Sequence, residues 1–349
     1  VQIIPHVTNH IQQTIAKTGK GFDVHIIEVG GTVGDIEGLN FLEAIREMAF
    51  KKPEDCLFVH VVYVPHLGAS SEFKTKPAQS SVRELLRLGI APDILVARSE
   101  VKTPKSIISK LSLFSGVDSR AIVLLPNAKT IYQVPLSLED SGIGDVITSR
   151  LGLRRASANL TDWKRVVKSA LTNYRKTVRI GLIAKYLENQ DTYMSLTEAL
   201  KASGWANDVN VDIVWIDSET LQKDKKYRKV LDEVDGLVGL PGFGSRGAEG
   251  KIAAATYAYE QKIPYLGICF GMQMAIVAMA RRAGLSKATS TEFDQKTTEP
   301  VISTMAEQIG KENTGGTMRL GDWKCILEQG SKARRIYGSA EIVERHRHR

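Results

Sequence analysis

Short apolar runs alternate with helical segments along most of this chain, and this alternation limits the folds that it can adopt. In the first half, the predicted strands cover residues 57–64, 93–97 and 121–125, and the predicted helices cover 38–50, 80–89 and 104–114. Residues 1–20 also read as a helix, and residues 22–29 form a β-rich run. Strands that alternate with helices favour a parallel sheet covered on both faces. We therefore expect an α/β protein.

The alternation stops over residues 154–177 and then starts again, which predicts two domains. The interruption is polar and basic, and it reads as a partly helical linker. After it, strands are predicted at 178–184, 210–216, 236–240 and 264–268, and helices at 191–203, 248–261 and 270–283. A chain of 349 residues is long enough for two separate cores. The predicted domains are residues 1–153 and 178–349.

Composition excludes several classes of protein. The chain is 43% hydrophobic and 25% charged, and it has no membrane-spanning apolar run or signal-peptide pattern. Cys56, Cys269 and Cys325 are scattered, without metal-ligand or disulfide spacing, which fits a reducing cytoplasm. The net charge of +8 suits anionic ligands. Nucleotides qualify as such ligands as well as nucleic acid does. Because no nucleic-acid-binding signature accompanies the charge, we expect neither nucleic acid nor a membrane as a partner.

The stretch 264–273 carries the clearest chemical signal. An apolar run ends at Cys269, which stands between Gly267 and Gly271, and a helical segment follows. A strand that turns sharply into a helix holds its turn residue in a strained, exposed conformation. The N-terminus of that helix is expected to lower the pKa of the thiol and to offer N–H groups to an oxyanion. Cys269 is thus a candidate nucleophile, and a buried structural cysteine is the alternative.

Two stretches of the first half carry charged residues beside glycine or proline. Glu28 ends the β-rich run, and the glycines that follow allow close approach of a ligand to the backbone. Asp35 opens the next helix together with Glu37, and it could simply cap that helix. Lys74 and Lys76 would share one face of a strand, or belong to a solvated loop. Residues alone leave these alternatives open.

Together these stretches resemble the CTP synthase family, in that family's order along nearly the whole chain. The segments that carry the resemblance are 28–37, 74–79, 243–251, 264–273, 290–293, 315–321 and 344–349. Residues 264–273 also resemble the nucleophile elbow of class I glutamine amidotransferases. The resemblance implies a synthetase domain of the phosphate-loop type joined to a flavodoxin-like amidotransferase domain. It further implies ATP- and Mg²⁺-dependent conversion of UTP to CTP with ammonia from L-glutamine, activation by GTP, inhibition by CTP, and a homotetramer.

The resemblance also assigns roles to single residues. It makes Cys269 the catalytic nucleophile and Glu28 a magnesium ligand. The residues matched to UTP and CTP binding are Asp35, Ile36, Glu37, Lys74, Thr75, Lys76, Pro77, Ala78 and Gln79. Those matched to glutamine binding are Gly242, Phe270, Gly271, Met272, Gln273, Glu292 and Arg349. The N–H of Phe270 would be one oxyanion donor, and that of Gly242 the second if the family's donor stands at that position.

The chain departs from the family pattern at several places. Pro241 replaces a glycine and has no N–H, and a lost oxyanion donor costs roughly 3 kcal/mol of barrier. Pro126 and Asn127 stand where a basic or imidazole residue and an aspartate are usual. No Gly-x-x-x-x-Gly-Lys-Ser/Thr loop occurs, and only His346 and His348 follow the cysteine, with no carboxylate after them. We therefore expect a partial sequence that makes no CTP by itself.

Two other functions remain open at this point. A free-standing cysteine hydrolase of the amidotransferase fold would explain Cys269 but not the stretches 30–37 and 74–79. A degenerate nucleotide-binding subunit would explain Pro126 and Pro241.

Overall fold

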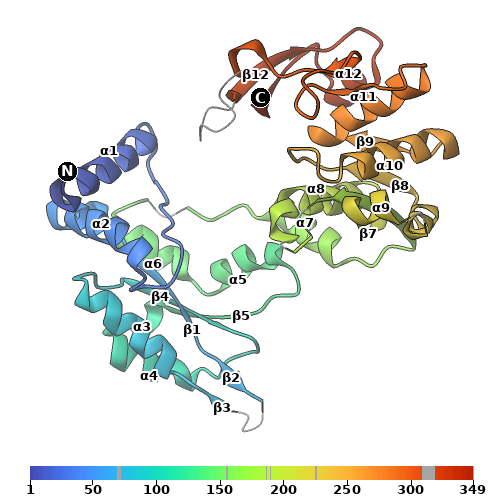
Figure 1. Ribbon diagram of the computed structural model, residues 1–349. Helices are drawn as coiled ribbons and strands as arrows, with labels where there is room; N and C mark the ends of the chain where they lie inside the picture. The colour runs from blue at the N-terminus through green and yellow to red at the C-terminus, as the bar shows by residue number, and fades with distance from the viewer. Residues whose placement is uncertain are drawn as a thin grey trace. The chain divides into compact units, whose positions relative to one another are not determined.

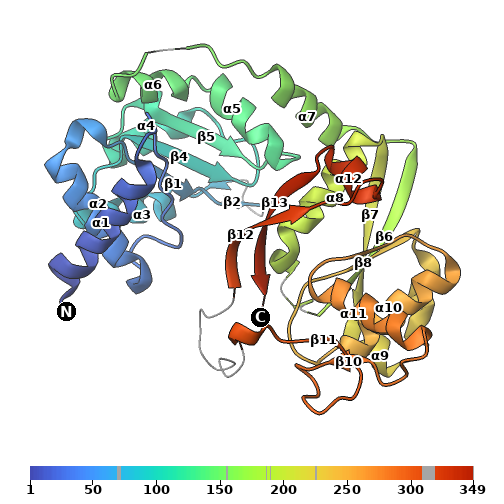
Figure 2. The same cartoon turned by 90° about the horizontal axis from the view of Figure 1, so that it is seen from above.

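The computed structural model describes residues 1–68, 72–154, 156–185, 187–188, 190–224, 226–308 and 319–348. The chain divides into two compact units, Val1–Thr172 and Asn173–Arg349, and each is described by itself (Figures 1 and 2). The division lies inside the segment 154–177 that the sequence predicts to be a linker. Part of that segment is helical and belongs to the first unit, where Trp163 donates its Nε1–H to the carbonyl of Tyr132 at 2.7 Å.

The first unit is built on a parallel sheet with the strand order β1-β4-β5. Its strands are β1 (Val59–Tyr63), β4 (Ile94–Ser99) and β5 (Ile122–Pro126). A short antiparallel pair, β2 (His66–Leu67) and β3 (Glu72–Phe73), follows β1. The helices are α1 (Thr8–Gly19), α2 (Leu39–Lys51), α3 (Lys76–Arg87), α4 (Ser106–Ser115), α5 (Val134–Asp140), α6 (Ile143–Arg150) and α7 (Thr161–Leu171).

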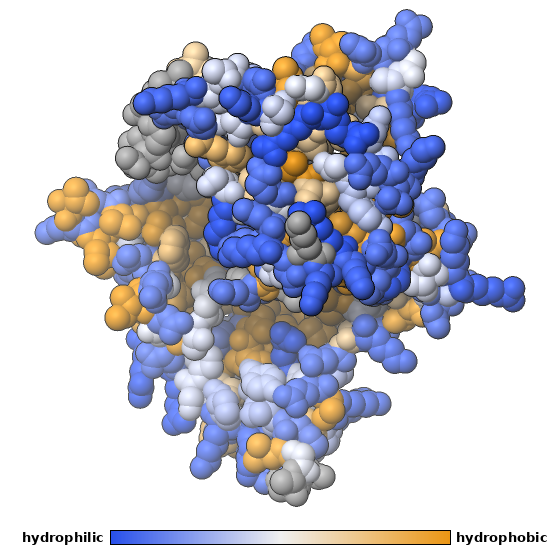
Figure 3. All heavy atoms as spheres, turned by 45° about the vertical axis from the view of Figure 1, so that its right-hand side comes forward, coloured by the Kyte–Doolittle hydropathy of each residue, from blue (hydrophilic) through white to orange (hydrophobic). Residues whose placement is uncertain are grey.

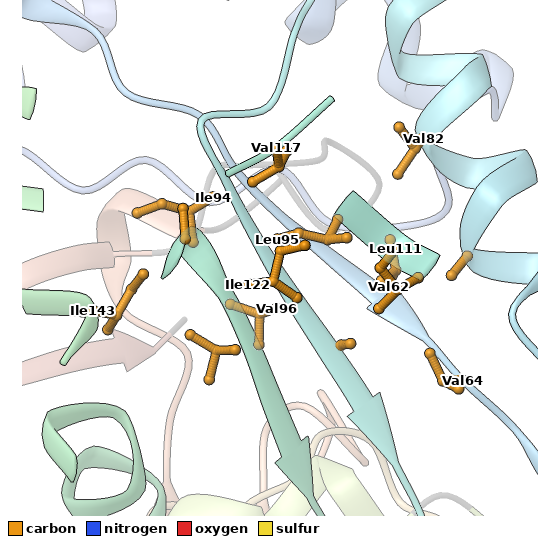
Figure 4. Close-up of a cluster of buried hydrophobic side chains, with 14 residues drawn as sticks. Val62, Val64, Val82, Ile94, Leu95, Val96, Leu111, Val117, Ile122 and Ile143 are labelled. Atoms are coloured by element: carbon orange, nitrogen blue, oxygen red, sulfur yellow. The ribbon is translucent and has the colours of Figure 1, made fainter. Parts of the chain in front are cut away.

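The core of this unit lies on both faces of its sheet. Successive side chains of a strand point to opposite faces, and in Figure 4 Leu95 lies near Leu111 of α4 while Ile94 lies toward Ile143 of α6. The sequence predicts that residues 57–64 are buried on both faces. That prediction is wrong for β1, because Val59 and Val61 are 49% and 57% exposed. In the described part of the chain, β1 is covered on one face.

Residues 22–29 form no strand in this structure, contrary to the β-rich reading of their sequence. Ile26 and Ile27 are 87% and 45% exposed. A strand needs a neighbour that accepts and donates its ladder hydrogen bonds, and no described strand pairs with this segment. Its end is nevertheless fixed, because Val29 packs with Leu42 of α2 and Leu85 of α3.

The second unit contains a parallel sheet with the strand order β7-β6-β8-β9. Its strands are β6 (Lys176–Ala184), β7 (Val209–Asp217), β8 (Gly236–Gly239) and β9 (Tyr265–Gly267). The helices are α8 (Met194–Ala206), α9 (Ser218–Lys223), α10 (Ala248–Gln261), α11 (Phe270–Arg282) and α12 (Lys332–Tyr337). Outside this sheet, β10 (Thr289–Ser290) pairs with β11 (Pro300–Ile302), and β12 (Arg319–Ile326) pairs antiparallel with β13 (Glu341–His348).

Helices cover both faces of the four-stranded sheet. Leu182 and Ala184 of β6 pack in a cluster with side chains of α8, whereas Ile183 packs with Ala254 and Ala258 of α10. The α/β class with parallel sheets is thus confirmed in both units. The strand order reverses between β6 and β8, and in such sheets the crevice at the carboxyl ends beside the reversal is the usual place for a ligand.

Side chains at the surface are mostly polar on the face that Figure 3 shows, with hydrophobic residues in separate clusters. None of the described helices combines the length and the apolar character needed to cross a membrane.

Candidate active site

Three neighbouring strands of the second unit end at the same edge of the sheet, and each leads into a residue of the candidate site. Lys185 follows β6, residues 240–244 follow β8, and Cys269 follows β9 after one residue. Parallel strands share one carboxyl edge, so these segments meet. The Nζ of Lys185 donates to the carbonyls of Phe243 and Gly244, the latter at 3.5 Å, which ties the first two segments together.

Cys269 occupies a strained turn between β9 and α11, as the sequence predicts. Its φ of 52° lies in the left-handed region, which a residue with a side chain rarely adopts. The glycines beside it make this turn possible through close backbone packing. A Cβ at Gly271 would collide with the carbonyl of Gly239, and one at Gly267 would lie 2.5 Å from the Cα of Met272.

Two backbone N–H groups near the thiol of Cys269 act to lower its pKa. They belong to Phe270, the first residue of α11, and to Gly242, in the segment after β8. Gly242 is buried against the ring of Phe270, where an added Cβ would lie 3.4 Å from Cδ1. On the β8 side, the N–H that lowers the pKa of the thiol is that of Gly242.

The sequence predicts a lowered pKa for the Cys269 thiol, but in the structure this pKa is raised. Burial raises the pKa, and this effect outweighs the N–H groups of Phe270 and Gly242 and the positive charge of Lys251, which lower it. The charge of Glu292 raises the pKa further. A half-buried sulfur loses the water that would stabilise its thiolate. The thiol is therefore protonated at neutral pH, and a nucleophilic role requires a base.

Glu292 is brought to the same place by the turn after β10. Its Oε1 accepts the N–H of Gly244 at 3.0 Å, and the neighbouring Phe293 packs edge-on against Phe270 with ring centroids 6.0 Å apart. A carboxylate thus lies beside the segment that carries the Gly242 N–H. Such a group could bind the α-ammonium of an amino acid.

The other residues matched to glutamine lie around the first turn of α11 or outside the described chain. Gly271, Met272 and Gln273 belong to that turn, and the Gln273 N–H donates to the Cys269 carbonyl at 3.0 Å. Arg349 and residues 315–318 lie outside the described residues. His346 and His348 are part of β13, where they pair with Gly321 and Arg319 of β12.

In the first unit, the two lysines flank the start of α3 and do not share a strand. Lys74 follows β3 and forms an ion pair with Glu72 at 2.6 Å, whereas Lys76 is the first residue of α3. The residues next to the two lysines are well packed, since Thr75 and Ala78 are buried and the side chain of Gln79 donates to Thr75 Oγ1 at 3.0 Å. A helix N-terminus with two lysines suits phosphate.

The stretch 28–37 is also attached to α3. Gly34 lies against Glu84, about two helical turns from the start of α3. Asp35 does not cap the helical turn Ile36–Gly38, because its side chain instead accepts the N–H of Thr32 at 3.1 Å. Ile36 and Glu37 are exposed. Both candidate nucleotide segments are therefore supported by one helix.

Glu28 offers a single exposed carboxylate for a metal ion. Within the described ranges, no three His, Cys, Asp or Glu side chains gather in a way that could hold a metal. Mg²⁺ commonly takes only one or two protein carboxylates and completes its shell with phosphate and water. Glu28 therefore fits as one ligand of an ion that arrives with a nucleotide.

Sequence reasoning missed two lysines beside the cysteine. Lys251 on α10 is fully buried, and its Nζ donates to the carbonyls of Ile183 at 2.5 Å and Leu240 at 3.0 Å. Lys185 is also buried. A signal existed for Lys251, because its spacing to Ala254, Ala255 and Ala258 places it on the apolar face of the helix.

Comparisons with known proteins match both units. The family model described as "CTP synthase N-terminus" matches residues 1–153, and "Glutamine amidotransferase class-I" matches residues 189–349. A curated CTP synthase from Methanocaldococcus jannaschii is 46% identical over 359 residues, which cover 100% of this chain and 66% of that protein. One from Roseiflexus castenholzii is 48% identical over 354 residues, with 100% and 63% covered.

A solved structure described as "Trypanosoma brucei CTPS - glutaminase domain with bound acivicin" is 39% identical, with a TM-score of 0.45. The match covers 49% of this chain and 67% of that one. The chain spans 66% and 63% of the length of the two curated relatives.

Proposed function

The chain belongs to the CTP synthase family, and from that premise we propose that it takes part in the ATP-dependent amination of UTP to CTP. The ammonia is released from glutamine at Cys269. The observation that carries this proposal is the strained Cys269 at the start of α11, at the sheet edge where the segment after β8 binds Glu292. The enzyme class is a ligase that forms a C–N bond with glutamine as nitrogen donor.

In the glutaminase reaction, the sulfur of Cys269 attacks the carboxamide carbon of glutamine. The N–H groups of Gly242 and Phe270 stabilise the oxyanion that forms, and ammonia leaves as the thioester is made. Water then hydrolyses the thioester to glutamate. Because burial keeps the thiol protonated, a base has to accept its proton and pass it to the leaving nitrogen, which then departs as ammonia. The resemblance to class I glutamine amidotransferases gives this task to a histidine.

Glutamine is oriented by the residues around the first turn of α11 and by Glu292. The carboxylate of Glu292 would bind the α-ammonium of glutamine, and the N–H of Gly244 holds it in place at 3.0 Å. The amide end of the glutamine side chain would lie against Gly271, Met272 and Gln273, and Arg349 would bind the α-carboxylate of glutamine. This arrangement would select an amino acid whose amide reaches Cys269.

In the synthetase reaction, ATP phosphorylates the uracil 4-oxygen and ammonia displaces the phosphate. The stretch 35–37 would recognise the pyrimidine nucleotide, and residues 74–79 at the start of α3 would bind its phosphates. Glu28 would contribute one oxygen to Mg²⁺, which neutralises phosphate charge. GTP as activator, CTP as inhibitor, a homotetramer and a cytoplasmic location complete the proposal.

The nucleotide site is tested in a hybrid enzyme, in which residues 1–349 are joined to the parts of the Methanocaldococcus jannaschii relative outside the match. Lys74→Ala and Glu37→Ala should each weaken UTP use and CTP inhibition by about 10- to 100-fold, since a charge-assisted hydrogen bond contributes about 1.5–3 kcal/mol. The glutaminase rate should hardly change. Nucleotide affinities follow from steady-state kinetics.

Lys105→Ala is the matched control, because Lys105 is an exposed lysine of the same unit that precedes α4. It should leave UTP and CTP affinity unchanged. Unaltered affinity for both nucleotides in the Lys74 and Glu37 variants would show that the site is wrongly assigned.

A further inference from the structure

A buried cation lies beneath the candidate glutaminase site. Lys251 is 0% exposed, and its Nζ donates to Ile183 at the end of β6 and to Leu240 just after β8. These strands lie on either side of the reversal in strand order. Burial of an ammonium group is costly even when it is hydrogen-bonded. An apolar side chain such as methionine would fill this position at a lower cost, so packing alone does not account for a lysine.

The hydrogen bonds of the two lysines determine how the segment after β8 is oriented. Lys251 binds the carbonyl of Leu240, and Lys185 binds the carbonyls of Phe243 and Gly244. The same segment carries the N–H of Gly242, which lowers the pKa of the Cys269 thiol. Both ammonium groups also lie over the ring of Phe270, at 5.9 Å for Lys251 and 5.7 Å for Lys185.

We propose that Lys251 is a positioning residue of the glutaminase site. Its hydrogen bonds hold residues 240–244 so that the Gly242 N–H reaches Cys269, and its positive charge favours the thiolate. The proposal rests on the proposed role of Cys269 as nucleophile.

The charge of Lys251 depends on pH in a range that can be measured. Burial and the nearby charge of Lys185 lower the pKa of Lys251 to about 7, while Cys269 acts to raise it. Lys185 in turn faces Arg246, Glu219 and Glu292. The ammonium form is therefore present below about pH 7 and lost above it. A neutral amine still has two N–H groups for two carbonyls, so the positioning role persists where the charge is lost.

The test is the rate at which iodoacetamide alkylates Cys269 in this chain, followed by mass spectrometry of its peptide from about pH 5.5 to about pH 9. Lys251→Met removes the charge and the donors. It should slow alkylation about threefold below pH 7. A thiol pKa raised by about one unit leaves about tenfold less thiolate, but that thiolate is about threefold more reactive, so the two effects partly cancel. The ratio of the two rates should become smaller above about pH 8 but stay above one, because only the loss of the donors then separates the variant from the unmodified chain. Lys201→Met, which changes an exposed lysine of α8, should have no effect.

A faster reaction in Lys251→Met, or a rate ratio that does not change with pH, would overturn the proposal. A faster reaction would mean that Lys251→Met exposes Cys269 to solvent and so removes the burial that raises the pKa of the thiol. If Lys251→Met does not fold, Lys251→Gln keeps amide donors without the charge, so it should slow alkylation below about pH 7 and match the unmodified chain above about pH 8. Alkylation requires no glutamine, so failure here is distinct from failure of the proposed function.

Discussion

The Cys269→Ala hybrid enzyme should lose CTP synthesis from glutamine and keep CTP synthesis from free ammonia. Without the sulfur no thioester can form, so glutamine-dependent turnover should fall by at least about 1,000-fold. Ammonia bypasses that step, and its rate should change by less than about twofold. Parallel assays with glutamine and with ammonium chloride measure both rates. Cys325→Ala, at an exposed cysteine of the same unit, should leave both rates unchanged.

Each departure from this result has a distinct meaning. Retained glutamine use by Cys269→Ala would contradict the amidotransferase function of the second unit. Equal loss of the glutamine and ammonia rates would show that position 269 acts on folding, which a thermal melt would reveal independently.

The second large effect is expected at Gly242. Gly242→Pro removes the N–H that lowers the pKa of the Cys269 thiol, and loss of one oxyanion donor should lower the glutamine-dependent rate by about 100-fold or more. A substituent at this position also meets the ring of Phe270 at 3.4 Å and the Cδ of Lys185 at 3.6 Å. Gly242→Ala introduces that contact and keeps the N–H. Its rate should therefore lie much closer to that of the unmodified hybrid.

Pro241→Gly completes the comparison. The N–H that it restores is not the one that lowers the pKa of the thiol, so the glutamine-dependent rate should change by less than about threefold. A gain near 100-fold would instead identify position 241 as the donor. If Gly242→Ala lost as much activity as Gly242→Pro, the effect would be steric.

The parts of the site that local sequence encodes were predictable. The apolar run, the cysteine and its two glycines define a turn whose strain depends on backbone contacts between near neighbours, so Cys269 could be recognised before the fold was known. The alternation of strands and helices likewise predicts parallel sheets, because each strand of such a sheet needs a helical crossover. Both are properties of short segments.

The parts that depend on distant segments were not predictable. Residues 22–29 have strand-forming side chains, yet no described strand pairs with them. The direction of the Cys269 pKa shift depends on burial by the whole unit, which outweighs the local helix terminus. The contact of Lys251 with Ile183 joins residues 68 positions apart. Spacing places Lys251 on the apolar face of α10, but only the assembled sheet supplies its carbonyl partners.

The central claim is that Cys269 is the nucleophile of a glutamine site, and covalent labelling tests it most directly. The hybrid enzyme is treated with acivicin, a glutamine analogue, and the modified peptide is identified by mass spectrometry with and without excess glutamine. We expect the label on Cys269 and strong protection by glutamine. A label on Cys56 or Cys325, or labelling of Cys269 that glutamine does not reduce, would contradict the claim.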